Sequence, residues 1–164
     1  MIAVTDVMSR AVATVGPTWT LAELAGFLAD EKVLGAPVVD DAGKLVGVVS
    51  TTDLVAAIGD DGASYGSEPV FGVFDGAGRW EPLSARLSRE RFENGDTKVA
   101  DVMTTDPITA TPDASVGEVA ALLLEHGIHR LIITSDGLLR GIVTATDLLA
   151  ALVAYGEREI ASQV

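Results

Sequence analysis

Residues 47–54 read Gly-Val-Val-Ser-Thr-Thr-Asp-Leu, and residues 141–148 read Gly-Ile-Val-Thr-Ala-Thr-Asp-Leu. In both stretches a β-branched run passes directly into hydroxyl residues and an aspartate, which predicts a strand that ends where a helix begins. The stretch Val4–Ser9 likewise returns as Val99–Thr104. The chain therefore contains two copies of one unit of about 55 residues, close to the lower limit for independent folding. We expect the two copies to pack together.

The hydrophobic periodicity predicts the element order β-α-β-β-α in each copy, and so an α+β fold class. In the second copy a helix begins after Ser115 and ends at Gly127, and two strands follow at Leu131–Ile133 and Gly141–Thr144. A last helix begins at residues 146–147. The matching elements of the first copy are a helix over Leu21–Asp30, strands over Ala36–Val39 and Leu45–Val49, and a helix from Asp53.

The two copies divide the chain into four segments: repeat 1 (residues 1–58), an insert (59–98), repeat 2 (99–155) and a C-terminal tail (156–164). The insert holds seven of the 17 glycines and five of the eight aromatic residues, so its composition differs from that of both repeats. A linker of this length usually has a role of its own. Within it we expect a hairpin over residues 70–80 and a short helix over Pro82–Phe92.

The composition excludes several classes of protein. With 48% hydrophobic and 21% charged residues, the chain is too apolar to be disordered. It has no cysteine, which excludes disulfide scaffolds, thiol catalysis and cysteine-ligated metals. Eleven basic against 24 acidic residues give a net charge of −13, and such a field repels nucleic acids and anionic membranes. No run of about 18 apolar residues occurs and the N-terminus lacks a signal-peptide core, so we expect a cytoplasmic protein.

The polar residues at each strand-to-helix junction have two interpretations. As a helix cap, a hydroxyl or carboxylate accepts a hydrogen bond from a free N–H of the first turn, and one such residue suffices. As a binding site, the aspartate accepts from vicinal ribose hydroxyls, while the hydroxyl and the helix N-terminus hold a phosphate. Because each copy places three such residues, the pattern favours ligand binding. They are Ser50, Thr52 and Asp53 in repeat 1, and Thr144, Thr146 and Asp147 in repeat 2.

The two repeats resemble a pair of CBS (cystathionine β-synthase) domains, in which Asp-Val-Met-[Ser/Thr] opens a repeat and Gly-x-x-[Ser/Thr]-x-x-Asp closes it. Residues 6–9 and 47–53 match these motifs in repeat 1, and residues 101–104 and 141–147 match them in repeat 2. The resemblance implies a pseudo-two-fold pair of repeats, a Bateman module. It also implies a non-catalytic regulatory module that requires no cofactor. Its ligand would be AMP, ADP, ATP or S-adenosylmethionine, bound in the clefts between the repeats.

The resemblance also implies roles for particular residues. The junction residues of each repeat would hold the ribose, with Thr52 and Thr146 contributing less than the other four. The adenine wall of one repeat would face the ribose motif of the other. A homodimer would form where helices Leu54–Ile58 and Leu148–Tyr155 meet across a two-fold axis, and a regulated partner protein would read the ligand state. The residues implied for the adenine wall are Ala13, Val33, Leu34, Ile108 and Ile128.

His129 and Arg130 are a possible phosphate site. Taken alone, His129 is better interpreted as a hydrogen-bonded strand residue and Arg130 as a solvated charge. The dipeptide is similar to a His-Arg pair in the γ subunit of AMP-activated protein kinase, which meets nucleotide phosphates, and arginine suits bidentate phosphate contacts. Repeat 1 carries Leu34-Gly35 at the matching place. The resemblance therefore implies unequal sites, with the phosphates bound mainly beside Arg130.

The remaining motifs predict neither a metal site nor catalysis. His126 and His129 lie three residues apart at a helix end, and no third ligand accompanies them. The sequence has neither a phosphate-binding loop with lysine nor a serine elbow. Two alternatives to a nucleotide sensor stay open: an interaction module with unoccupied clefts that uses the insert to bind a partner, and, less favoured, an enzyme with its site in the insert.

Overall fold

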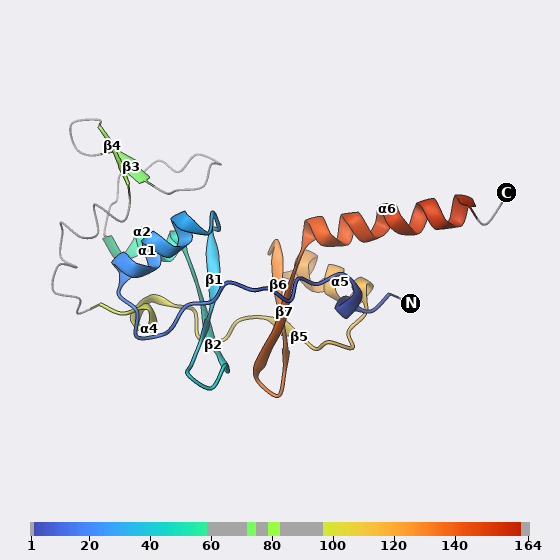
Figure 1. The fold of residues 1–164 in the computed structure, drawn as a ribbon, viewed down its shortest axis with the longest axis horizontal. Helices are drawn as coiled ribbons and strands as arrows, with labels where there is room; N and C mark the ends of the chain where they lie inside the picture. Colours follow the sequence, from blue (N-terminus) through green and yellow to red (C-terminus); the bar gives the residue numbers. More distant parts are fainter. Residues whose placement is uncertain (1, 59–71, 75–78, 83–96, 162–164) are drawn as a thin grey trace. The chain divides into compact units, whose positions relative to one another are not determined.

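The structure is a computed structural model, and it describes residues 2–58, 72–74, 79–82 and 97–161 (Figure 1). The chain forms two compact units. Unit 1 contains Met1–Val12 and Ile108–Val164, and unit 2 contains Ala13–Pro107. Each unit thus combines most of one repeat with the opening segment of the other.

Unit 2 contains the helix and the strand pair of repeat 1. The core of this unit includes Leu21, Leu24 and Leu28, which are fully buried along one face of α1. Strands β1 and β2 are antiparallel, with Gly35 opposite Ser50, and Val15 pairs with Val38 in parallel at the other edge. The elements are α1 (Leu21–Asp30), β1 (Gly35–Val39), β2 (Leu45–Ser50), α2 (Thr51–Ile58), β3 (Gly72–Phe74), β4 (Trp80–Pro82) and α4 (Val99–Val102).

Unit 1 repeats this plan with one more strand. Strand β6 lies between β5, to which it is parallel, and β7, to which it is antiparallel. Leu131, Ile133 and Val143 fill the core beneath α5. Gly127 ends α5 with φ of 62°, the left-handed conformation that glycine adopts most easily. The elements are η1 (Val4–Asp6), β5 (Thr109–Ala110), α5 (Val116–His126), β6 (Arg130–Ser135), β7 (Leu138–Thr144) and α6 (Ala145–Ala161).

Capping boxes begin helices α1 and α5. The backbone N–H of Glu118 donates to Ser115 Oγ at 3.2 Å, and Glu118 Oε2 accepts from the N–H of Ser115 at 2.8 Å. Thr20 and Glu23 form the same pair at α1. Hydrogen bonds from the capping residue, first from its backbone N–H and then from its hydroxyl, lower the pKa of both glutamates below their ordinary value.

The observed elements agree with the sequence prediction apart from their ends and from the first strand of repeat 1, which is reduced to a single bridge between Val15 and Val38. Helix α2 begins at Thr51, two residues before the predicted start, because Ser50 is its cap. Helix α6 begins at Ala145, before the predicted start at residues 146–147, for the same reason. The predicted hairpin is confirmed where it is described, as the antiparallel pair β3 and β4. The helix predicted over residues 82–92 lies outside the described residues, apart from Pro82, which belongs to β4.

The segment that opens each repeat pairs with the strand that carries the junction motif of the other repeat. Ser9 and Ile142 exchange two backbone hydrogen bonds, at 2.8 and 2.9 Å, on the outer side of β7. Thr104 and Val48 exchange two bonds of 2.9 Å on β2. We name residues 2–9 the first strap and residues 98–104 the second strap. The similarity of the two opening stretches gave no indication that they would be exchanged between the repeats.

The methionine of each strap packs directly on a glycine of the strand. A Cβ added at Gly141 would lie 2.7 Å from Met8 Sδ and 2.8 Å from the carbonyl oxygen of Ser9. A Cβ at Gly47 would lie 2.7 Å from Met103 Sδ. Real Cβ atoms do not approach so closely, so both positions require glycine. The glycine that opens each closing motif therefore makes room for the strap.

Replacing either glycine should test this packing. We expect Gly47→Ala and Gly141→Ala each to lower the free energy of unfolding by about 1–3 kcal/mol, because the added methyl overpacks the contact. The control is Gly26→Ala within α1, where an added Cβ meets no atom within 4 Å. That change should stabilise the protein by roughly 0.5–1 kcal/mol through helix propensity. Urea unfolding measures all three, and an equal response of the three variants would contradict the packing argument.

Candidate ligand-binding motifs

In unit 2, the junction motif of repeat 1 is a capping box between Ser50 and Asp53. The backbone N–H and the hydroxyl of Ser50 both donate to Asp53 Oδ2, at 2.7 and 2.8 Å. The N–H of Asp53 lies 3.4 Å from Ser50 Oγ in return. Both side chains are half-buried. Strand β2 thus ends at Ser50, and the side chain of Ser50 caps helix α2.

Unit 1 builds the same motif from Thr144 and Asp147. The N–H and Oγ1 of Thr144 donate to Asp147 Oδ2, each at 2.7 Å, and the N–H of Asp147 lies 3.3 Å from Thr144 Oγ1. These two residues are also half-buried, whereas Thr146 is exposed, as Thr52 is in repeat 1. Neither exposed threonine takes part in a capping box.

These bonds show that the capping interpretation holds for two of the three junction residues in each copy. All the hydrogen bonds that Asp53 and Asp147 accept fall on one oxygen, Oδ2. Within the described part of the chain, the second oxygen of each carboxylate accepts none. A carboxylate oxygen has lone pairs for further donors, so the cap leaves each aspartate able to accept from a ligand. Capping and binding are therefore compatible roles.

In unit 2, the predicted wall residues Val33 and Leu34 lie beside the junction. The N–H of Thr51, the first residue of α2, donates to the carbonyl oxygen of Leu34 at 2.9 Å. Val33 is half-buried against the core, and the side chain of Leu34 is 40% exposed. Ala13 is half-buried and precedes Val15, the residue that pairs with β1.

In unit 1, the corresponding residues gather at the beginning of β6. Ile108 and Ile128 are half-buried against the core. The carbonyl oxygen of His129 accepts from the N–H of Ala145 at 3.0 Å. Arg130 lies directly opposite Thr144 in the antiparallel pair and is exposed, as His129 is. An exposed arginine is therefore the cross-strand neighbour of the hydroxyl residue of the junction motif.

The matching position of repeat 1 is Gly35, opposite Ser50. A Cβ on Gly35 would lie 2.8 Å from the carbonyl oxygen of Val49. The backbone of unit 2 therefore excludes any side chain where unit 1 carries Arg130. The sequence showed this difference in residue type, and the structure adds its steric reason.

The predicted residues thus form two groups, one in each unit. Ser50 and Asp53 lie with Leu34 in unit 2, and Thr144 and Asp147 lie with Arg130 in unit 1. The crossed pairing of one repeat's wall with the other's ribose motif stays a prediction. The sequence did not predict the hydrogen bonds that the carbonyl groups of Leu34 and His129 accept from the first residues of α2 and α6. A backbone contact does not depend on residue type, so no sequence pattern indicates it.

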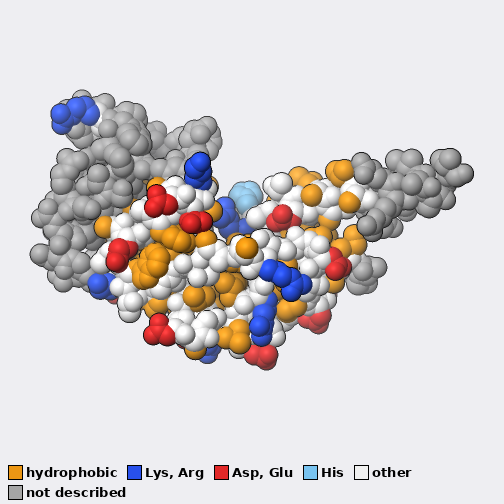
Figure 2. Space-filling view, in the orientation of Figure 1, with side chains coloured by type: hydrophobic (Ala, Val, Ile, Leu, Met, Phe, Trp, Pro, Cys, Tyr) orange, Lys and Arg blue, Asp and Glu red, His pale blue; other side chains and the backbone are white. Residues whose placement is uncertain are grey.

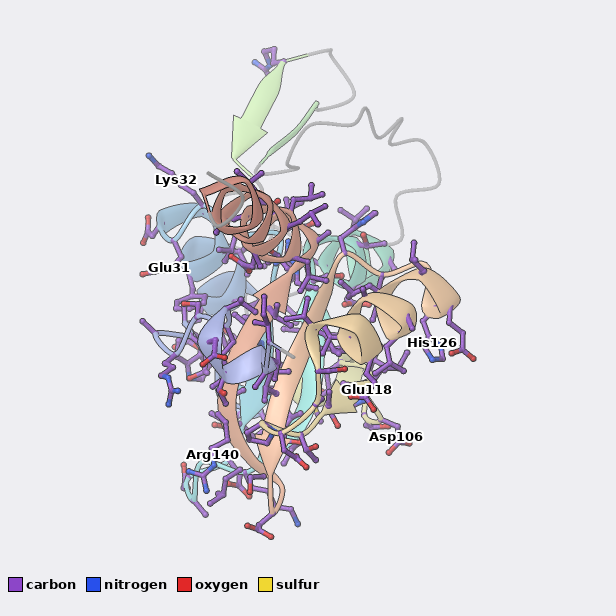
Figure 3. All side chains as sticks on the ribbon, turned by 90° about the vertical axis from the view of Figure 1, so that its right-hand side faces the viewer. Glu31, Lys32, Asp106, Glu118, His126 and Arg140 are labelled. Carbon is purple, nitrogen blue, oxygen red and sulfur yellow. The ribbon has the colours of Figure 1, made fainter. Side chains whose placement is uncertain are left out.

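Among the described residues, no three side chains of the metal-binding types cluster together. His126 projects from the end of α5 into solvent (Figure 3), and His129 is also exposed. Figure 2 shows acidic and basic side chains scattered over the visible face rather than gathered in one field. No helix of the described residues has the length and apolarity to cross a bilayer.

Comparison with known sequences and structures follows the same repeats. The sequence model of the CBS domain matches residues 4–60 and 99–154, more than half of the chain. An uncharacterized protein of Methanocaldococcus jannaschii is 36% identical over 129 residues, a match that covers 74% of each chain. The chloroplastic CBS domain-containing protein CBSX1 of Arabidopsis thaliana is 33% identical over 138 residues, which are 84% of this chain and 57% of that relative. This chain therefore spans little more than half of CBSX1.

Two solved structures share the fold over nearly the whole chain. The crystal structure of CBSX2 in complex with AMP has a TM-score of 0.69 at 27% identity and covers 95% of this chain and 99% of its own. The putative acetoin utilization protein AcuB from Vibrio cholerae has a TM-score of 0.69 at 27% identity, with 100% and 98% covered. The α+β arrangement of paired repeats is therefore confirmed.

The capping geometry predicts how stability responds at the junction. Asp147→Asn keeps one oxygen that accepts from Thr144, so we expect the free energy of unfolding to change by only a few tenths of a kcal/mol. Asp147→Ala removes both acceptors and should lose about 1 kcal/mol. Asp101→Asn is the matched control, because Asp101 Oδ2 accepts from the N–H of Lys98 at 2.7 Å in a cap outside the motif. Chemical denaturation distinguishes these outcomes, and equal losses for Asn and Ala at position 147 would refute the cap.

Proposed function

The chain belongs to the CBS-domain family, and on that premise we propose that it is a non-catalytic regulatory module for adenosine-containing ligands. The candidates are AMP, ADP, ATP and S-adenosylmethionine, bound in clefts between the two repeats. The observation that carries the proposal is the junction aspartate of each repeat, held through one oxygen and able to accept through the other. The AMP complex of CBSX2 supports an adenosine ligand.

The proposed binding chemistry divides among three kinds of group. The second oxygen of Asp53 or Asp147 accepts from a ribose hydroxyl, with Ser50 or Thr144 beside it. Apolar side chains that are partly open to solvent, such as Leu34 and Ile128, cover the adenine face. A charge-assisted contact from Arg130 holds phosphate oxygens, with a further donor from His129. These groups bind and orient a ligand, and none of them is an activated nucleophile.

The two sites are proposed to differ in ligand charge. Only unit 1 offers a guanidinium at the position opposite the junction hydroxyl, because Gly35 leaves no side chain there in unit 2. We place nucleotides with two or three phosphates beside Arg130. The site of Asp53 then suits an adenosyl group with less negative charge, or stays empty. Binding would shift the repeats relative to each other, and a cytoplasmic partner would respond to that shift.

Dimerisation is proposed to use α6 alone. Leu149, Leu152 and Val153 follow one another at helical spacing and are 62–66% exposed, and hydrophobic side chains are visible along α6 in Figure 2. Leu54 and Val55, expected at the same interface, are already buried, at 0% and 5% exposure. Two α6 helices meeting across a two-fold axis would cover the open stripe of both copies.

Isothermal calorimetry with adenosine, AMP, ADP, ATP and S-adenosylmethionine tests the proposed function. We expect at least one of these to bind, and Asp53→Asn or Asp147→Asn to weaken it by about 1–3 kcal/mol, because an amide replaces a ribose acceptor with a donor. Asp101→Asn should bind as the parent does. If no ligand of the panel binds, the clefts are unoccupied and the interaction-module alternative replaces the proposal.

Arg130→Ala tests the phosphate role separately from the ribose role. Loss of a charge-assisted contact should weaken ATP and ADP by roughly 1.5–3 kcal/mol and leave adenosine nearly unaffected. Arg140→Ala, which removes another exposed arginine of the same sheet, is the charge-matched control. Calorimetry in a single buffer measures both variants. Equal losses for adenosine and ATP would show that Arg130 does not hold phosphates.

Leu152→Glu tests the dimer. A carboxylate at the centre of the α6 stripe cannot be buried without its counter-charge, so the variant should sediment and scatter light as a monomer at micromolar concentration. The parent should remain dimeric with and without nucleotide. Leu124→Glu, on α5, is the control for an exposed leucine outside the stripe. A monomeric parent would refute the dimer without affecting the ligand proposal.

A further inference from the structure

Met8 and Met103 occupy equivalent places on the two straps. Each thioether packs on a strand glycine so closely that one added carbon at the glycine would stand 2.7 Å from the sulphur. In each case the residue that follows the methionine makes both backbone bonds to the strand: Ser9 to Ile142, and Thr104 to Val48. The methionine is therefore the side chain of the strap that contacts the strand glycine at the point of pairing, while Val4 and Val99 anchor the straps in the two cores.

Both methionines can be reached by solvent. Their side chains are half-buried, and Ser9 and Thr104, the next residues of the straps, are exposed. The chain has no cysteine and only one further methionine, Met1, so thioethers are its only sulphur groups. Methionine is the side chain that a mild peroxide oxidises in a protein without thiols.

An added oxygen would disturb this contact for two reasons. A sulfoxide oxygen is a strong acceptor, and the carbonyl oxygen of Ser9 or Thr104 lies at the same glycine as the sulphur. Two acceptors repel each other, and the neighbouring N–H groups of Ser9 and Ile142, or of Thr104 and Val48, are already paired. The oxygen therefore finds no backbone donor in the strap pairing, and the need to hydrate it favours movement of the side chain away from the glycine.

We propose that Met8 and Met103 are sites of reversible oxidation by hydrogen peroxide, and that oxidation loosens the straps. The peroxide transfers one oxygen atom to the thioether sulphur, which is oxidised by two electrons to the sulfoxide, and the second oxygen leaves as water. Methionine sulfoxide reductases reverse the step, one for each sulfoxide epimer. Oxidation of Met8 would affect the strap that pairs with β7 in unit 1, and oxidation of Met103 would affect the strap that pairs with β2 in unit 2.

The straps lie beside the strands that end at the junction motifs. Ile142 precedes Thr144 by two residues, and Val48 precedes Ser50 by two residues. Loosening of a strap should therefore disturb the geometry of the junction motif at the end of the strand that it pairs with. Oxidation would then lower the affinity for nucleotides. That consequence rests on the proposed function, whereas release of the strap does not.

Hydrogen exchange after peroxide treatment tests the proposal. The protein is oxidised with dilute hydrogen peroxide, the sulfoxides are located by mass spectrometry, and amide exchange is measured by NMR. We expect sulfoxide at both residues while the fold is intact, and roughly tenfold faster exchange at the amides of Ser9, Ile142, Thr104 and Val48. Reduction of the sulfoxides should restore the original exchange rates.

Met8→Leu and Met103→Leu are matched controls, since leucine has nearly the same volume and no sulphur. After peroxide, Met8→Leu should keep slow exchange at Ser9 and Ile142 and lose it at Thr104 and Val48, and Met103→Leu should show the reverse. Sulfoxide at both sites with unchanged exchange would overturn the proposal. So would oxidation that occurs only after global unfolding, or loosening that persists in the double leucine variant.

Discussion

The hydrogen bonds that one carboxylate oxygen accepts at the end of β2 and of β7 fix the geometry on which both motifs depend. Asp53 Oδ2 and Asp147 Oδ2 each accept from the N–H and the hydroxyl of the preceding cap residue. This arrangement ends the strand, begins the helix and directs the aspartate toward the junction. Because the cap needs a single oxygen, the same side chain can maintain the fold and bind a ligand. In many sites those two demands compete.

The junctions in turn require strands that are paired on both sides. Strand β6 covers one side of β7, and the first strap covers the other through Ser9. On β2, Thr104 of the second strap plays the same part. The strand that carries each junction motif is therefore paired on one side by its own repeat and on the other side by the opening segment of the other repeat. A repeat near the lower size limit for folding thus completes the pairing of its motif strand with a segment of the other repeat.

Much of this organisation can be read from the sequence because it is local. Capping residues, glycine stops and alternating strands act over a few neighbours, so α1, α5 and the strand pairs lie where their patterns predicted. The exchange of straps was not predictable, since Val4–Ser9 and Val99–Thr104 are alike and would fit either repeat equally well. The requirement for glycine at positions 47 and 141 was not predicted either, because it comes from the straps, distant in sequence, whose backbone carbonyls and methionine side chains approach these glycines. Pairing between distant segments depends on complementary shape, which residue type encodes only weakly.

At the junctions the two repeats share the same backbone arrangement and differ in the side chains around it. Both junctions have the same cap, with hydrogen bonds of nearly equal length, so the feature that the two repeats share is the one that begins the helix. Opposite the cap, one repeat has Arg130 and the other has Gly35, whose place admits no side chain. On the last helix, one repeat leaves Leu149 open and the other buries Val55 at the matching position. Once a shared backbone secures stability in both copies, the charge and exposure of the surrounding side chains are free to diverge, and only one of the two junctions has a cation opposite its cap.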